Sequence, residues 1–161
     1  MQAGSPMRED QSGRRPVDEL AAHLLRRGSP LRIKARGGSM TPFLWDGDVA
    51  LVTPTAGRDV GVGDVICYEA PPGKLFLHRV IARDRERFVT KGDALAFIEV
   101  VDRAQLLGTV VAIERCGKMK RLDTRAARWR NRAVASLSPL SPWIVPLALR
   151  LRRVWRAAFH G

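Results

Sequence analysis

The stretch "KLFLHRVIARDRERFVTK", residues 74–91, decides the fold class of this chain. In its first run, residues 74–82, alternate side chains group on one face of an extended backbone: Phe76, His78, Val80 and Ala82. This period of two is typical of a β-strand that packs one face on a core. The run at 87–91 follows a short polar segment and predicts a second strand.

Strand-like runs continue on both sides of this stretch. From Leu31, apolar residues alternate with basic ones. Clusters of Gly, Pro and Asp separate the remaining runs, which lie at residues 48–53, 64–69 and 106–114. Short strands with tight connections predict a mainly β protein, with a compact antiparallel β domain over residues 30–117.

A short helix precedes the predicted strands. The segment "PVDELAAHLLRRG" has Pro16 and Asp18 at its start, arginines in its last turn and Gly28 after its end. Residues 1–29 are therefore predicted to be a disordered N-terminus followed by this helix. The first residues contain acids and a proline where a signal peptide needs an unbroken apolar segment, so we expect no signal peptide or N-terminal anchor.

The charge of +12 is distributed unevenly along the 161 residues. Residues 118–161 carry eleven Lys and Arg and one acid, whereas residues 1–117 carry 17 bases and 15 acids. This division predicts a nearly neutral domain followed by a basic tail that meets an anionic surface.

The end of the tail, "PLALRLRRVWRAAFHG", places an apolar stripe opposite its arginines when drawn as a helix. A basic amphipathic helix of this kind lies on anionic membranes, with contacts expected from Arg150, Arg153 and Trp155. The alternative is that the helix packs on the domain or on a protein partner. No helix-turn-helix or RNA-binding motif accompanies the bases, so a nucleic-acid partner is not expected.

The longest uncharged run, Ala133–Leu149, has 17 residues and three prolines. Because a spanning helix needs about 20 predominantly apolar residues, we do not expect this run to cross a membrane. The expected location is peripheral on a membrane, or cytoplasmic. The cysteines, Cys67 and Cys116, form no CxxC pair and have no histidine at ligand spacing, so no metal site and no cofactor is expected.

Ser39 stands in "RGGSMTPFLWDGDVALV", residues 36–52. A serine beside glycines is most often a turn residue. It is a nucleophile only where a base lies within hydrogen-bond reach and backbone N–H groups can receive the oxyanion. Of the three histidines, His23 lies on the predicted helix and His160 at the chain end, so only His78 is placed to be that base.

The base can also be argued from pKa values. A lysine needs its pKa lowered by about 2–3 units to act near neutral pH, whereas histidine begins near 6.5. The lysines that remain possible, but are expected to be solvated charges at strand edges, are Lys34, Lys74 and Lys91. Three carboxylates after His78 could hold its imidazole in one tautomer: Asp93, Glu99 and Asp102.

Four segments in series, "GGSMTPFLWDGDVALV", "VGVGDVICY", "LHRVI" and "FVTKGDALAFIEVVDRAQLLGTVV", resemble the ordered boxes of the signal peptidase I superfamily, which includes LexA-type autoproteases. The resemblance spans about residues 35–113. It implies a β-rich catalytic domain and a serine endopeptidase at a membrane surface, with Ser39 of the Ser-Met-x-Pro box as nucleophile. Most bacterial members have a lysine base, and His78 in its place resembles the endoplasmic-reticulum, archaeal and some Gram-positive branches.

The same resemblance implies an acid six residues past the aspartate of Lys-Gly-Asp, where this chain has Glu99 in place of the usual aspartate. Asp93 lies within the most recognisable box and is slightly preferred as the third catalytic member, with Glu99 and Asp102 left open. Oxyanion and substrate contacts are expected from Gly38, Met40 and Pro42.

Together these features predict a signal-peptidase-like serine endopeptidase that cleaves an extended segment of a precursor protein. In this prediction Ser39 is the nucleophile and His78 is the general base. Two other functions stay open. One is a specialised maturation protease that removes a leader from a single partner. The other is a non-enzymatic binding module on a degenerate peptidase fold.

Overall fold

The computed structural model describes residues 14–57, 59–70, 73–122 and Ala133. The described part starts with a helix, α1 (Arg14–Arg26). It continues as strands, with a 3-10 turn, η1 (Arg103–Gln105), between two of them. The strands are β1 (Leu31–Lys34), β2 (Val49–Pro54), β3 (Val65–Ala70), β4 (Lys74–Arg83), β5 (Arg87–Lys91), β6 (Glu99–Asp102), β7 (Leu106–Arg115) and β8 (Lys118–Arg121).

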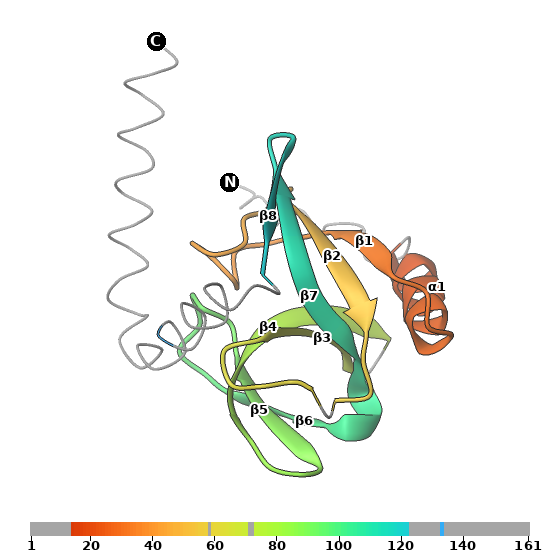
Figure 1. Cartoon of the computed structure of the whole chain (residues 1–161), viewed down its shortest axis with the longest axis vertical. Coiled ribbons are helices and arrows are strands. Elements are labelled where there is room, and N and C mark those ends of the chain that lie inside the picture. Colours follow the sequence, from red (N-terminus) through yellow and green to blue (C-terminus); the bar gives the residue numbers. More distant parts are fainter. Residues whose placement is uncertain (1–13, 58, 71–72, 123–132, 134–161) are drawn as a thin grey trace, which may run out of the picture.

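Within the described residues the eight strands form one sheet, in the order β1-β2-β7-β3-β4-β5-β6, with β8 paired to β7. Every pairing is antiparallel. Register shifts interrupt β2, β3 and β4, and such bulges bend and twist a sheet. Figure 1 shows the result: β4 curves through the molecule, with β5 and β6 at one end and α1 beside β1 and β2.

The bent sheet packs around two hydrophobic clusters. The first is covered by α1, whose Ala22 and Leu25 are buried among side chains of β1, β2 and β7. The second lies where β3, β5 and β6 meet, around Tyr68 and Phe88. Because side chains alternate along a strand, β4 contributes Leu75 and Leu77 to the first cluster and Phe76 to the second. The strand that carries His78 is thereby fixed from both sides.

The mainly β, antiparallel prediction is confirmed, and the predicted helix is found as α1. The six predicted strands are β1 to β5 and β7, whereas β6 and β8 were not anticipated. The sheet continues past the predicted domain end at residue 117, since β8 follows and Leu122 is buried in the first cluster. The predicted tail helix lies outside the described residues.

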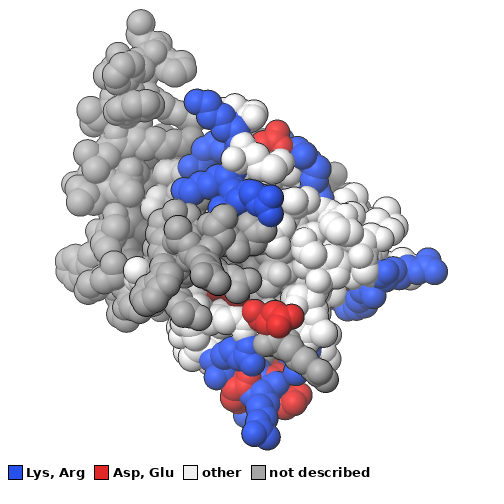
Figure 2. Space-filling model, in the orientation of Figure 1, with Lys and Arg blue, Asp and Glu red and all other residues white. Residues whose placement is uncertain are grey.

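Basic side chains gather near the end of the molecule where β7 turns into β8, on the face seen in Figure 2. All four residues of β8, "KMKR", are exposed. Among the helices of the described part, none is long and apolar enough to span a bilayer.

Candidate active site

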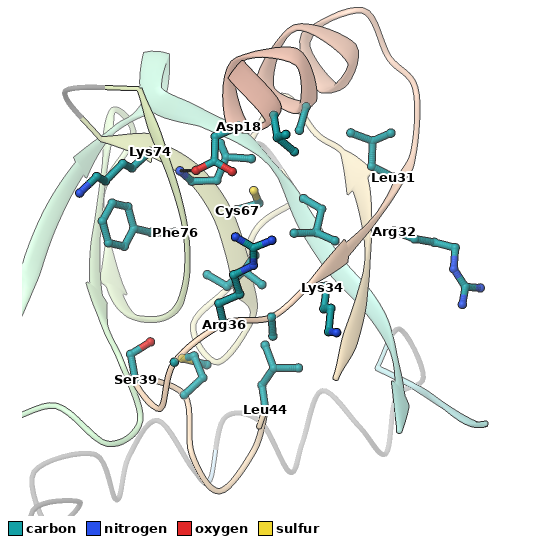
Figure 3. A pocket seen from close by; sticks show the side chains of 18 of the residues that line it. Asp18, Leu31, Arg32, Lys34, Arg36, Ser39, Leu44, Cys67, Lys74 and Phe76 are labelled. Carbon is teal, nitrogen blue, oxygen red and sulfur yellow. Dashed lines mark hydrogen bonds between the residues drawn. The ribbon is translucent and has the colours of Figure 1, made fainter. Parts of the chain in front are cut away.

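A groove of about 770 Å³ opens beside Ser39. Its walls are α1, β1 with the residues that follow it, and the first half of β4 (Figure 3). In the described sheet β1 pairs only with β2, and residues 74–77 pair with β3 but not with β5. The groove therefore runs between two strand edges that have no neighbouring strand, and edges of this kind accept an extended peptide.

The interior of the groove is largely apolar. Met40, Leu44 and Cys67 line it and are buried, each at most 3 % exposed. Burial raises the pKa of the Cys67 thiol to about 12, so this cysteine stays protonated and acts as a small apolar residue. A peptide in the groove would meet apolar side chains beneath its backbone.

The loop between β1 and β2 carries Ser39 to the groove. Its ends are joined because Ala35 N donates to Asp48 O at 2.8 Å. Gly37, two residues before the serine, has a φ of 77°, in the left-handed region that favours glycine. Gly37, the first glycine of the pair before Ser39, thus allows the loop a backbone conformation that other residues rarely adopt.

The Lys-Gly-Asp segment packs directly on this loop. Ala94 N donates to Ser39 O at 2.9 Å, and a Cβ on Gly92 would lie 2.7 Å from the same oxygen. Any side chain at position 92 would therefore push the two segments apart. Two of the sequence boxes, far apart along the chain, are in contact at the serine.

Apart from the hydrogen bond that its carbonyl oxygen accepts from Ala94 N, Ser39 forms no hydrogen bond with the described residues. Its hydroxyl forms no hydrogen bond to any described residue, His78 included, and it lines the groove. The backbone N–H groups of Ser39 and Met40 likewise meet no acceptor among the described residues. A hydroxyl and two N–H groups at one groove are the elements that a nucleophile and an oxyanion site require.

His78 lies in the middle of β4 and is 3 % exposed. Its Nδ1 lies 2.9 Å from Glu99 Oε2, on β6, across the intervening strand β5. Carboxylate oxygens accept hydrogen bonds, so a proton on Nδ1 satisfies this contact and leaves the lone pair of Nε2 available. The structure therefore brings together a histidine and an acid. Their contact favours the imidazole tautomer that a general base needs.

Tyr68, on β3, completes this cluster. Its hydroxyl donates to Glu99 Oε2 and lies 2.8 Å from His78 Nδ1. Burial, with Glu99 beside it, holds the pKa of Tyr68 above its ordinary value, so the hydroxyl remains a donor. Glu99 is thus fixed by two donors, and the imidazole is fixed by Glu99.

Burial lowers the pKa of His78 below its ordinary value of 6.5, and the charge and hydrogen bond of Glu99 act in the opposite direction. The imidazole is consequently neutral at neutral pH. Phe76 connects this cluster to the groove, because it lines the groove and its ring centroid lies 5.9 Å from that of His78.

Asp93 has a different partner. Both of its oxygens accept from Arg79, at 2.8 Å and 2.6 Å, and Arg79 also donates to Gly63 O at 2.8 Å. The guanidinium lies 4.3 Å from the ring centroid of Phe43, in the Ser39 loop. Arg79 is fully buried, so this ion pair joins β4, the Lys-Gly-Asp segment and the serine loop in the interior.

The structure thus places Glu99, and not the slightly preferred Asp93, within hydrogen-bond distance of the imidazole. A bidentate guanidinium contact uses both carboxylate oxygens, and Glu99 occupies the place beside His78. Asp102 is exposed at the end of β6 and caps η1, and its backbone N–H donates to Gln105 Oε1 at 2.9 Å.

Lys91, directly before Gly92, is the lysine that competes with His78 as a base. It is 5 % exposed, and burial lowers its pKa, with Asp93 acting in the opposite direction. Of the other lysines considered, Lys34 is exposed and Lys74 is half-buried. Both lie along the groove rather than beside the imidazole.

The remaining predicted site residues are distributed as follows. Gly38 O accepts from Thr41 N at 3.1 Å in a turn, Met40 lines the groove, and Pro42 is exposed. The predicted membrane contacts, Arg150, Arg153 and Trp155, lie outside the described residues. Over the described part of the chain, no group of three or more His, Cys, Asp and Glu side chains is arranged to hold a metal ion.

Two residues of the site were missed at the level of sequence. Tyr68 is the only tyrosine of the chain, and it sits diagonally across β3 and β4 from His78, a relation that depends on strand register. Arg79 follows His78 directly, so it faces the opposite side of β4. Leu75 and Leu77 share its face of the strand, and these apolar neighbours were the available signal.

Neither a scan against protein-family models nor a search of curated proteins finds a match to this chain. The likeness to signal peptidase I therefore rests on the residues of the four boxes themselves.

Proposed function

We propose that this protein is a signal-peptidase-like serine endopeptidase that cleaves an extended segment of a precursor protein. The observation that carries the proposal is the contact of His78 Nδ1 with Glu99, next to a groove lined by Ser39. A neutral imidazole held by a carboxylate is suited to remove a proton from a serine hydroxyl.

In the proposed reaction His78 Nε2 takes the proton of Ser39 Oγ as this oxygen attacks the scissile carbonyl. The N–H groups of Ser39 and Met40 donate to the oxyanion of the tetrahedral intermediate. His78 then gives its proton to the leaving amine, and an acyl-enzyme remains on Ser39. Water attacks the acyl group by the same route, with His78 again as base, and frees the serine.

Glu99 and Tyr68 act on the base and not on the substrate. Glu99 keeps the proton on Nδ1 and stabilises the imidazolium that forms during each step. Tyr68 holds Glu99 in place. Because Ser39 Oγ has no hydrogen bond to His78 in the described structure, the serine must rotate or shift when a peptide enters, as catalytic hydrogen bonds often tighten only in the substrate complex.

The competing function is a peptide-binding module on a peptidase fold that has lost activity. The observation in its favour is the same missing hydrogen bond between Ser39 and His78. The groove would serve either function. A specialised maturation protease for one partner differs from the general proposal only in the breadth of substrates cleaved.

Digestion of an unbiased peptide library, read by mass spectrometry, tests the proposal. We expect cleavage by the wild type and loss of activity by a factor of about a thousand or more in Ser39→Ala and in His78→Ala. Ser29→Ala and His23→Ala are matched controls, since both side chains are exposed and outside the site, and they should retain activity. Equal turnover by Ser39→Ala would remove the serine mechanism, and a library left intact by the wild type would favour the binding module.

The basic tail suggests where the peptidase works. We propose peripheral attachment to an anionic membrane through the arginines after residue 149. The full chain should sediment with anionic vesicles at low salt and leave them at high salt, because salt screens the attraction. Failure to bind vesicles would favour a protein partner for the tail, and resistance to salt would favour insertion of residues 133–149.

A further inference from the structure

The groove beside Ser39 carries charge as well as apolar surface. Asp18, on α1, is the acidic side chain of its lining, and its carboxylate accepts from Leu75 N at 3.5 Å. Lys34 and Arg36 lie on the wall formed by β1 and its continuation. A further base, Lys74 on β4, lines the groove on the side of Asp18, whereas Lys34 and Arg36 come from the strand that leads to Ser39 (Figure 3).

Arg36 differs from the other arginines near the groove. Arg32 points away from it and pairs with Glu114. The Arg36 side chain instead projects into the groove, between β1 and β4, as Figure 3 shows. It is exposed, and none of the described residues forms a hydrogen bond or ion pair with it.

An unpaired guanidinium in a groove with apolar walls is a site for a carboxylate. The planar fork of donors matches the two oxygens of a carboxylate, and each such bond is charge-assisted. A peptide that covers the groove removes water from the contact, which strengthens the attraction relative to a surface ion pair. Leu31, Ile33 and Ala35 alternate with the bases on this wall, so neighbouring peptide side chains would meet apolar surface.

We propose that Arg36 makes the groove selective for extended peptides that bear an acidic side chain, Asp or Glu, within a few residues of the scissile bond. The selectivity rests on the proposed endopeptidase function, because it is the substrate class of that same groove. Arg36 lies three residues before Ser39, which places its contact close to the reacting carbonyl. Because Arg36 occupies one place on the groove wall, the acidic residue has one preferred position in the peptide.

The test uses decapeptides with one small residue at the cleavage position and Asp, Asn or Lys scanned through the others. Cleavage is measured as kcat/KM with the wild type, and binding is measured by fluorescence anisotropy with Ser39→Ala, which needs no turnover. At one position the wild type should prefer Asp to Asn by roughly ten- to hundredfold. Arg36→Gln should lose this preference, and Arg36→Glu should prefer Lys at the same position. Arg87→Gln is the control, since Arg87 is exposed on β5 away from the groove, and it should keep the preference for Asp.

The outcomes separate this inference from the function on which it rests. Cleavage without a preference for Asp, or a preference that survives Arg36→Gln, would overturn the role of Arg36 and leave the peptidase standing. Binding of Asp peptides that depends on Arg36, without any cleavage, would keep the carboxylate site and overturn the peptidase. Peptides that are neither bound nor cleaved would overturn both.

Discussion

His78 and Arg79 are consecutive residues of β4, and each contacts a carboxylate from the segment after β5. Arg79 and Asp93 are 1 % and 8 % exposed at their side chains and form a buried ion pair. His78 is equally buried, but its partner Glu99 is 36 % exposed, and the imidazole is neutral. One pair holds segments together, whereas the other can bind and release a proton.

The difference shows how one strand can serve structure and chemistry at once. A buried ion pair stabilises only the geometry in which both partners are fully satisfied. The pair of His78 and Glu99 can bind and release a proton because it lies near the groove and near water. We therefore expect substitutions in the two pairs to act on different measurable quantities.

Of substitutions at the two carboxylates, Glu99→Gln should have the larger effect on activity. The substitution keeps the shape of the side chain but allows the amide to present its NH₂ group to Nδ1, which disfavours the required tautomer. We expect kcat to fall roughly 100- to 10,000-fold, with little change in the free energy of unfolding. Peptide cleavage and urea unfolding of the same preparation measure both. A large loss of stability with activity retained would assign Glu99 to the structure.

Asp93→Asn should show the reverse pattern. It leaves Arg79 charged and buried without its full partner, and breaking a buried ion pair costs about 3–5 kcal/mol of unfolding free energy. Urea or thermal unfolding measures the loss, and Asp84→Asn is the control, because its contact with Arg87 is exposed. If Asp93→Asn were as stable as the wild type yet inactive, Asp93 would belong to the catalytic group after all.

Gly92→Ala tests the contact between the two sequence boxes. The added Cβ would meet Ser39 O at 2.7 Å, so the serine loop must shift. We expect a loss of about 1–3 kcal/mol in stability and a fall in kcat on the order of 100-fold, because a shift near 1 Å misplaces the nucleophile. Gly61→Ala is the control, since its Cβ would meet its nearest neighbour at 3.7 Å. Full activity of Gly92→Ala would separate this contact from catalysis.

Tyr68→Phe should have the smallest effect on rate. It removes one hydrogen bond to Glu99 and leaves the ring in the second cluster. A hydrogen bond of this kind corresponds to roughly a two- to tenfold change in kcat, with KM unchanged. A change in KM alone, or in stability alone, would show that the hydroxyl does not position the base.

Much of the fold could be predicted from sequence because alternation marks strands that bury one face. β6 escaped this approach because its four residues, "EVVD", do not alternate between apolar and polar side chains. β6 carries Glu99, so the choice of acid depended on an element that the sequence did not reveal. The register across β4, β5 and β6 places Glu99 beside His78.

The roles of the charged residues were harder to predict. Ser39 and His78 stand in recognisable boxes, but an arginine such as Arg79 usually indicates a solvated surface. Its burial against Asp93 and Phe43 depends on three segments meeting in space. Contacts of this kind decide which of two similar carboxylates is free to serve a base.

The central claim is that His78, held by Glu99, is the base for Ser39, and the pH dependence of kcat/KM for peptide cleavage tests it most directly. Because burial lowers the pKa of His78, the acidic limb of the wild type should lie below pH 6.5. Glu99 raises that pKa, so its removal in Glu99→Gln should move the residual limb to still lower pH, while Lys91→Gln leaves the limb in place. A limb well above pH 6.5 that disappears in Lys91→Gln and stays unchanged in Glu99→Gln would contradict the claim and assign the base to Lys91.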